Sequence, residues 1–229
     1  MLSGAYYFIL ARRHHFERRL PKADMAGPMN IFVALVVAYL LGSVPFAYLA
    51  GWMRGVDIRT VGSNNVGATN VFRTLGKGIG FAVMGADISK GLVAALVAQA
   101  LTETPWPLVA ACAAILGHVF PVWLGFKGGK GVAVGGGAVL GIMPVPVLIL
   151  MGAFVVIVAL TRYVSLASIL SAAAFAPVSF LLGEPWPNVV FAAAASVFVI
   201  TKHLANIVRL LRHEEPRLDF SRSTSPGGP

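Results

Sequence analysis

The sequence predicts an all-α protein, a polytopic membrane helix bundle with about seven transmembrane helices. Of its 229 residues, 57% are apolar and only 12% are charged, whereas soluble domains have about 25% charged residues. The mean hydropathy is +0.79. Long uncharged stretches alternate with short polar segments, and each stretch is close to the roughly 20 apolar residues that a membrane-spanning helix needs.

The first half of the chain contains three predicted crossings. They cover residues 30–53, 78–101 and 108–124. We expect the first crossing to bend near Gly42 and Pro45, because proline interrupts helical hydrogen bonding. The third contains the single cysteine, Cys112. A lone thiol excludes a disulfide framework, and on an apolar helix it is more typical of packing than of a nucleophile.

The second half predicts the remaining crossings. Residues 132–160 are too long for one simple crossing and are interrupted by "MPVP" at 143–146. We interpret them as two short helices of about 14 residues each, one of which could be re-entrant, because such halves fall below the usual span. Segments 165–182 and 188–211 complete the bundle.

The charges test this order of crossings. With seven crossings, the basic segments fall on one side: 54–77, 127–130, Arg162 and 202–212. The turns without Lys or Arg fall on the other: 102–107, 143–146 and 183–187. Loops rich in Lys and Arg stay in the cytoplasm. This predicts an external N-terminus and a cytoplasmic C-terminus.

The two ends of the chain do not fit the bundle. The N-terminal extension, residues 1–28, carries five basic residues on the predicted outer side, against the charge rule. One hypothesis is that the natural protein starts at Met25 or Met29, which mass spectrometry of the native protein would disprove by finding residues 1–24. The tail, 216–229, has a disordered composition. Residues 29–215 then form a single membrane domain.

The first polar cluster, "GSNNVGATNVFR" at 62–73, lies on the basic side. Its glycines allow the backbone to turn its N–H groups toward an anion, and Ser63, Thr69 and Arg73 add side-chain donors. The alternative is a solvated loop whose Asn and Ser residues cap helices.

The second cluster, 122–137, contains seven glycines and two lysines, Lys127 and Lys130. Its spacing departs from that of a Walker A loop and Gly131 replaces the Ser or Thr, so nucleotide hydrolysis is disfavoured. The physics of phosphate binding remains: backbone N–H groups, a helix beginning near Val132, and lysine. The alternative is a glycine-packed turn with snorkelling lysines.

The third cluster is "KHLANIVRLLRHEE" at 202–215. On one continuous helix, Lys202, Asn206 and Arg209 would form a row of donors, with His203 beside them. The alternative is a helix end anchored at the membrane surface by basic residues. For Arg209 and Arg212 we favour that alternative, but His203 with Asn206 fits it less well.

Two other features are weaker candidates. Asp87 and Lys90, three residues apart in the second crossing, are most simply an ion pair inside the bundle, although ionisable groups in membranes are often functional. His118 is as consistent with a hydrogen-bonded core residue as with an acid or base. The sequence has no typical metal-binding spacing and no hydrolase nucleophile motif.

Six ordered motifs resemble those of the bacterial membrane glycerol-3-phosphate acyltransferases that use acyl phosphate as donor. They are "GSVPFAYL" (42–49), "GSNNVGATNVFR" (62–73), "DISKG" (87–91), "GHVFPVWLGFKGGKGVA" (117–133), "RYVSLASI" (162–169) and "KHLANIVRLLRHEE" (202–215). Two positions depart from the usual pattern, because Asn64 and His213 stand where the family commonly has Gly. Neither departure removes a charged donor.

The resemblance implies seven helices, a cytoplasmic-facing site in the inner membrane, and transfer of a fatty acyl group from acyl phosphate to the 1-hydroxyl of glycerol 3-phosphate. The products would be phosphate and lysophosphatidic acid, the first step of phospholipid synthesis. The reaction would need no metal or other cofactor and no nucleic acid. Its partners are the two substrates and membrane lipid, and we expect a monomer.

The resemblance also implies roles for individual residues. The catalytic candidates are His203 and Lys127. Glycerol 3-phosphate would be held by Ser63, Arg73, Lys127, His203 and Asn206. Acyl phosphate would be held by Thr69, Gly128, Gly129, Lys130, Gly131 and Ser165. Because phosphate is already a good leaving group, we expect direct transfer without an acyl-enzyme, with the proton taken either by the donor's own phosphate or by His203.

Two rival functions make different demands. A phosphate or organophosphate transporter would explain broken helices and intramembrane charge, but it favours polar groups at the midplane of two repeated halves. A CDP-alcohol phosphotransferase would need an Asp-rich metal motif, and the nine acidic residues are scattered.

Overall fold

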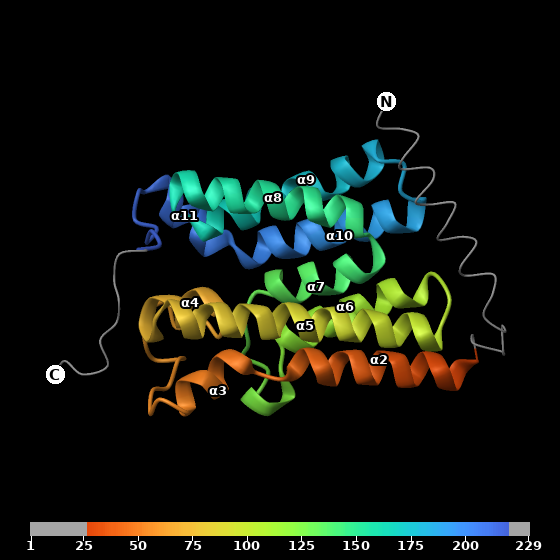
Figure 1. Ribbon diagram of the computed structural model, residues 1–229, viewed down its shortest axis with the longest axis horizontal. Coiled ribbons are helices and arrows are strands. Elements are labelled where there is room, and N and C mark those ends of the chain that lie inside the picture. Colours follow the sequence, from red (N-terminus) through yellow and green to blue (C-terminus); the bar gives the residue numbers. More distant parts are fainter. Residues whose placement is uncertain (1–26, 220–229) are drawn as a thin grey trace.

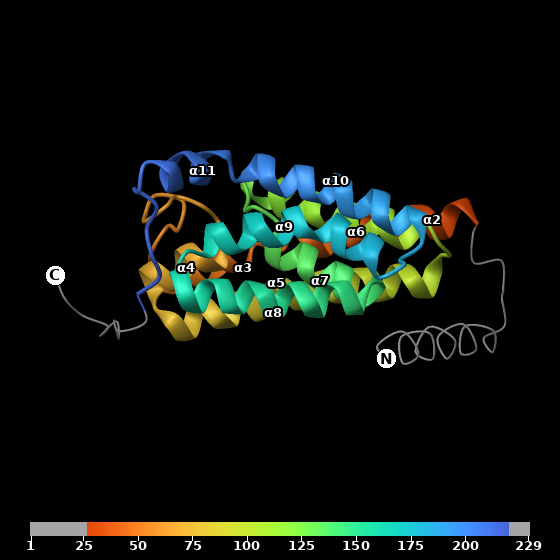
Figure 2. The same ribbon diagram turned by 90° about the horizontal axis from the view of Figure 1, so that it is seen from above.

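The computed structural model describes residues 27–219, all in helices or connecting segments. The described helices are α2 (Pro28–Ser43), α3 (Phe46–Trp52), α4 (Ala68–Leu75), α5 (Lys77–Leu101), α6 (Trp106–Val119), the 3₁₀ turn η1 (Val122–Leu124), α7 (Val132–Ile142), α8 (Pro144–Thr161), α9 (Val164–Leu181), α10 (Trp186–Lys202) and α11 (Leu204–Leu211). The long helices run side by side along one axis (Figures 1 and 2). The prediction of an all-α membrane bundle is confirmed.

Within the described residues, five segments are long and apolar enough to cross a membrane, and the pair α10 and α11 gives a sixth if it is counted as one span. The apolar helix α7 is too short to be counted among these spans, because it has 11 residues. At 1.5 Å per residue it is about 16 Å long, roughly half the hydrocarbon thickness. Figure 1 shows α7 reaching along only part of α5. The expected break at "MPVP" is present, but it divides the segment into 11 and 18 residues instead of equal halves.

Two further breaks shape the basic end. The first crossing is interrupted between α2 and α3 at Val44 and Pro45, as the proline predicted. The last was predicted as one helix, which is wrong, because α10 and α11 are bent by 59°. The chain turns there at His203.

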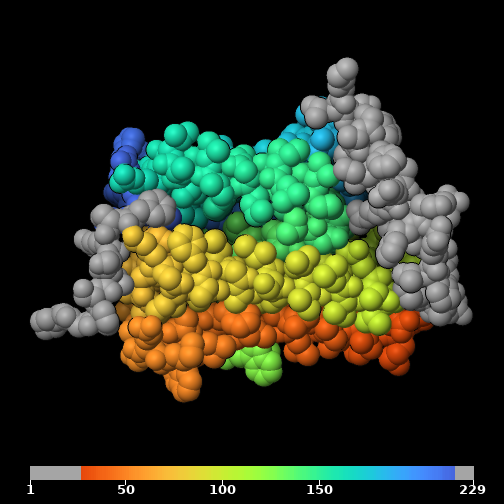
Figure 3. Space-filling view, in the orientation of Figure 1, coloured from red at the N-terminus to blue at the C-terminus, as the bar shows by residue number. Residues whose placement is uncertain are grey.

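Glycine brings the helices of the core close together in two reciprocal pairs. A Cβ on Gly91 of α5 would lie 2.1 Å from the Val134 oxygen of α7, and one on Gly137 of α7 would lie 1.9 Å from the Ile88 oxygen of α5. Gly42 of α2 and Gly117 of α6 stand in the same relation, with Cβ distances of 2.1 and 2.2 Å to the opposite backbone. Small residues at these crossings allow the backbones to approach. The surface in Figure 3 shows α2, α5 and α8 in successive rows.

The polar segments gather at one end of the bundle. Figure 1 shows α3, α4 and α11 together there, opposite the start of α2. The chain after α11 ties this end together: the Arg73 guanidinium donates to the Pro216 oxygen at 2.8 Å, and the Leu218 amide donates to the Arg162 oxygen at 2.8 Å. Ordered contacts therefore continue to Leu218, beyond the expected domain limit at 215. The N-terminal extension up to residue 26 and the tail from 220 lie outside the described residues.

Candidate functional site

The centre of the candidate site is the carboxylate of Glu215, which is not among the residues predicted from the sequence. Its Oε1 accepts hydrogen bonds from Ser165 Oγ and Asn206 Nδ2, each at 2.8 Å, and its Oε2 pairs with Arg209 Nε at 2.7 Å. These groups come from α9, α11 and the segment after α11. Burial opposes ionisation, but the three hydrogen bonds outweigh it, so the pKa of Glu215 lies below its usual value. A charged Glu215 thus organises the cluster.

Lys130 brings the glycine-rich loop into this cluster. Its ammonium donates to Asn206 Oδ1. Burial lowers the pKa of Lys130 to about 8, with Glu215 opposing the shift and Arg209 and Arg73 adding to it. The ammonium is therefore charged at neutral pH, yet it is less strongly hydrated than a surface lysine.

Arg73 approaches the same cluster from α4. Burial is the main cause that lowers its pKa, and Glu215 and Arg209 both act on it electrostatically. Its Nε is buried and has no hydrogen-bond partner within residues 27–219. Three cations, Arg73, Lys130 and Arg209, therefore surround one carboxylate. The excess of positive charge suits a phosphate.

His203 lies at the bend between α10 and α11 and is 3% exposed. Its Nδ1 is 2.8 Å from the Val199 oxygen. Because a carbonyl oxygen only accepts, Nδ1 carries the proton and Nε2 is left as an acceptor. Lys130 and Glu215 both lie within electrostatic range of this ring. The geometry therefore offers a proton acceptor beside the cluster.

The backbone amides of two loop glycines that were predicted to hold acyl phosphate already have partners. The amides of Gly128 and Gly129 donate to the Val119 and His118 oxygens at 3.0 and 3.1 Å. They are therefore occupied by the end of α6 and are not donors for a phosphate. The amide donors left for a ligand are those at the start of α7, because first-turn N–H groups have no partner within their own helix. Gly131 caps that helix with φ 82°.

The described contacts bring together only part of the predicted site. Arg73, Lys130, Ser165, His203 and Asn206 meet around Glu215. Lys127 and Ser63 are exposed and Thr69 is half-buried, and no described contact joins them to the cluster.

Two basic residues of the third motif differ from their predicted positions. Lys202 leaves the expected row of donors because the helix bends, and its ammonium lies 4.5 Å from the centre of the Phe120 ring. Arg209, predicted as a membrane anchor, instead pairs with Glu215. The sequence does contain one indication of the role of Glu215, because its carboxylate lies in a segment rich in basic residues. Its hydrogen-bond partners, however, lie up to 50 positions away in the sequence.

No group of three or more His, Cys, Asp or Glu side chains suited to a metal ion occurs in the described part of the chain. Cys112 is free and exposed on α6.

A family model described as glycerol-3-phosphate acyltransferase matches residues 32–213. The chain belongs to this family. A relative from Geobacter sulfurreducens is 47% identical over 191 residues, covering 82% of this chain and 98% of its own. One from Synechococcus elongatus is 43% identical over 207 residues, covering 86% and 99%. Both are named glycerol-3-phosphate acyltransferase.

Two solved structures agree with this assignment. The crystal structure of PlsY (YgiH), an integral membrane glycerol 3-phosphate acyltransferase, in its glycerol 3-phosphate form has a TM-score of 0.79 and 39% identity, covering 82% of this chain and 96% of that one. Its lysophosphatidic acid form has a TM-score of 0.76 and 38% identity, covering 82% and 95%. The chain is thus an integral membrane acyltransferase of glycerol 3-phosphate.

Proposed function

We propose that the chain transfers a fatty acyl group from acyl phosphate to the 1-hydroxyl of sn-glycerol 3-phosphate, giving lysophosphatidic acid and phosphate. The observation that carries this proposal is the cluster of Arg73, Lys130 and Arg209 around Glu215, at the mouth of an apolar bundle. Both substrates present a phosphate and one brings a fatty chain. A cationic cluster at the end of lipid-facing helices suits that combination.

The chemical step is a direct substitution at the acyl carbonyl. The 1-hydroxyl oxygen forms a bond to the carbonyl carbon, and the bond from that carbon to the phosphate oxygen breaks. The hydroxyl proton passes to the departing phosphate or to Nε2 of His203. Cations beside the anhydride stabilise the charge that develops on the carbonyl and leaving oxygens. Cys112 is exposed on α6 and no described contact joins it to the cluster, which favours transfer without a thioester.

The residue roles follow the predicted division. Lys127, at the exposed edge of the loop, and His203 act in catalysis. Ser63, Arg73, Lys127, His203 and Asn206 bind glycerol 3-phosphate. The acyl phosphate is held by the region of Thr69, Lys130, Gly131 and Ser165, while Gly128 and Gly129 shape the loop. One chain supplies the whole cluster, as a monomer requires.

The position in the cell is part of the proposal. Relatives of the chain are bacterial proteins, and the basic end carries the cluster. By the positive-inside rule the site faces the cytoplasm from the inner membrane.

The donor is tested by comparing palmitoyl phosphate with palmitoyl-CoA in the purified enzyme, with glycerol 3-phosphate as acceptor. With this acceptor present, lysophosphatidic acid should form when palmitoyl phosphate is the donor and should not form when palmitoyl-CoA is the donor. Formation from palmitoyl-CoA at an equal rate would refute the proposed donor.

Lys127→Ala tests the proposed catalytic role of that lysine. Loss of a charge-assisted phosphate contact should lower kcat/KM by an amount corresponding to roughly 2 to 4 kcal/mol. Cys112→Ala is the matched control and should keep the wild-type rate. A normal kcat/KM in Lys127→Ala would remove that residue from the mechanism, and loss of activity in folded Cys112→Ala would point to a thioester.

A further inference from the structure

A second polar group is buried beside the site without belonging to it. Asp87 and Lys90 on α5 are 2% and 5% exposed. Their carboxylate and ammonium are 2.7 Å apart, as the spacing in the sequence predicted. The ring of His118, on the last turn of α6, completes the group, with Nδ1 3.1 Å from the Lys90 ammonium. A buried ion pair is costly to desolvate, and apolar residues of similar size are often as stable. Such a group calls for a role beyond holding helices together.

Lys90 connects three elements. Its ammonium pairs with Asp87, donates to the Val44 oxygen at 2.7 Å, and contacts His118 Nδ1. Val44 is the residue at the break between α2 and α3. One charge therefore ties the broken first crossing to the end of α6.

The contact with Lys90 fixes the orientation of His118. An ammonium can only donate, so Nδ1 accepts and Nε2 carries the proton. Nε2 faces the glycine-rich loop: a Cβ on Gly129 would lie only 2.2 Å from it, and one on Gly128 would lie 2.1 Å from the His118 oxygen. The loop therefore rests directly on this histidine, by its ring and by its backbone.

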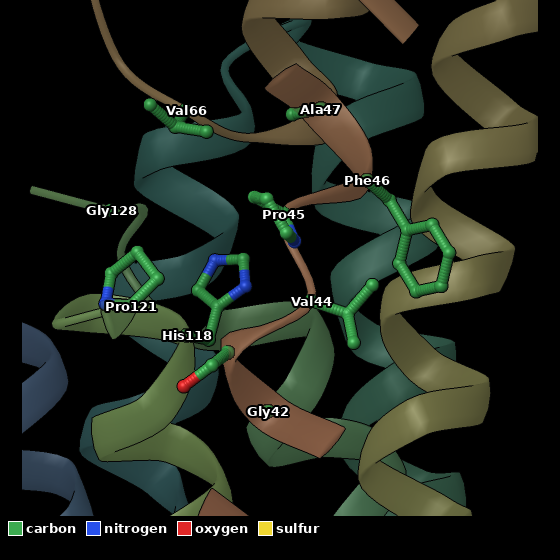
Figure 4. A pocket seen from close by; sticks show the side chains of 10 residues that line it. Gly42, Val44, Pro45, Phe46, Ala47, Val66, His118, Pro121 and Gly128 are labelled. Carbon is green, nitrogen blue, oxygen red and sulfur yellow. The ribbon is translucent and has the colours of Figure 1, made fainter. Parts of the chain in front are cut away.

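A small cavity adjoins the same contact. It has a volume of about 10 Å³, room for one water molecule, and its lining includes Ser43, His118 and Gly128. Figure 4 shows the imidazole of His118 in this cavity, near Pro121, Val44 and Gly128. Ser43 is fully buried, and its hydroxyl has no partner among the described residues. The loop thus borders, at Gly128, a small cavity that contains two polar side chains, Ser43 and His118.

We propose that Asp87, Lys90 and His118 are positioning residues, which set the place of the glycine-rich loop and hence of Lys130 and the start of α7. Asp87 holds the charge of Lys90, Lys90 fixes the tautomer and place of His118, and His118 supports Gly128 and Gly129. None of the three touches substrate. This inference rests on the proposed function in one respect, because it takes acyl phosphate as the ligand of the loop.

The decisive variant is the double substitution Asp87→Asn with Lys90→Met. It leaves no unpaired charge in the membrane, so it preserves the neutrality of the pair while removing the links to Val44 and His118. If the pair served only to compensate charge, this variant would behave as wild type. If it positions the loop, kcat should fall and KM for acyl phosphate rise, together lowering kcat/KM roughly 10- to 100-fold.

Substitutions of His118 separate its two nitrogens. Asn places a polar atom near the position of Nδ1, and Gln places one near Nε2. If support of the loop is what counts, His118→Gln should recover more of the rate than His118→Asn. Ser196→Ala is the control, because it removes a buried hydroxyl of α10 that donates to the Ala172 oxygen of α9 at 2.6 Å and has no described contact with the loop, and it should leave the kinetics unchanged.

Hydrogen exchange of the loop amides provides a readout that needs no substrate. In the double variant the amides of Gly128 and Gly129 should exchange faster, while those of α9 and α10 keep wild-type protection. If the wild-type enzyme were inactive with acyl phosphate, the proposed donor would be refuted. The exchange experiment would still test the positioning role, because it needs no substrate. Wild-type loop exchange together with wild-type kinetics in the folded double variant would overturn the positioning role.

Discussion

Among the described residues, four that are not glycine have left-handed backbone conformations, and two of them are Asn64 with φ 55° and His213 with φ 58°. At both positions, the resemblance described above implies that the family commonly has Gly. The left-handed region suits glycine, Asn tolerates it, and bulkier residues are strained there. Asn64 and His213 therefore retain a left-handed backbone conformation that glycine would adopt more readily.

Replacing His213 tests this backbone explanation. His213→Gly should leave the apparent Tm in detergent unchanged or raise it slightly, because relief of the left-handed strain is offset by the entropy of glycine. His213→Val should destabilise by about 1 to 2 kcal/mol, since a β-branched residue suits that region least. A Tm in His213→Val equal to that of His213→Gly would contradict the explanation.

The lowered pKa of Lys130 predicts a pH effect on substrate capture. The free enzyme should bind a phosphate well while Lys130 is protonated, so kcat/KM should fall as pH rises through about 8. Substrate phosphates are fully ionised there, because their second pKa is about 6. Profiles of kcat/KM between pH 6 and 10 provide the measurement.

Lys130→Gln is the control for this pH effect. It should be slower at neutral pH and should lack the fall near pH 8. An unchanged alkaline fall in Lys130→Gln would assign it to another group.

At the scale of helices, the core depends on the two reciprocal glycine crossings. In α7, Gly137 faces the backbone of α5, whereas the adjacent Gly136 has open space at its Cβ position. The sequence shows three successive glycines at 135–137 but does not show which one faces a neighbour.

These adjacent glycines form a matched pair of substitutions. Gly137→Ala should destabilise the enzyme by about 1 to 3 kcal/mol, because its methyl group would overlap the backbone at Ile88. Gly136→Ala should be neutral or stabilising by up to about 1 kcal/mol, since alanine favours the helix. Thermal unfolding in detergent compares the two, and equal shifts would contradict the packing.

Sequence reasoning could predict the long helices because apolar length and proline positions determine them locally. It missed α4 and the bend at His203, since both depend on how the basic end packs. It predicted the ion pair of Asp87 with Lys90 from local spacing. The role of Glu215 was not predictable, because its carboxylate is bound by Ser165 and Asn206, which only the folded chain brings together.

For the whole molecule, the distribution of charge and the position of the site are linked. The cluster around Glu215 lies at the end that also holds α3, α4 and the basic loops. The start of α2 lies at the opposite end of the long axis (Figure 1). In the orientation that we propose from the positive-inside rule, the site and the C-terminus face the cytoplasm.

Cysteine labelling tests this orientation in a Cys112→Ala background. Arg54→Cys lies at the basic end and Thr104→Cys at the other, and both positions are exposed. A membrane-impermeant maleimide should label Thr104→Cys in intact cells and Arg54→Cys only after permeabilisation. The reverse pattern would invert the proposed orientation.

Direct transfer is tested most simply by phosphate release from palmitoyl phosphate in purified, detergent-solubilised enzyme, with and without glycerol 3-phosphate and without metal or nucleotide. We predict that phosphate release requires the acceptor and equals lysophosphatidic acid formed, with no burst before the acceptor is added. A stoichiometric burst without acceptor would demonstrate an acyl-enzyme, and folded protein that releases no phosphate in either case would contradict the proposed reaction itself.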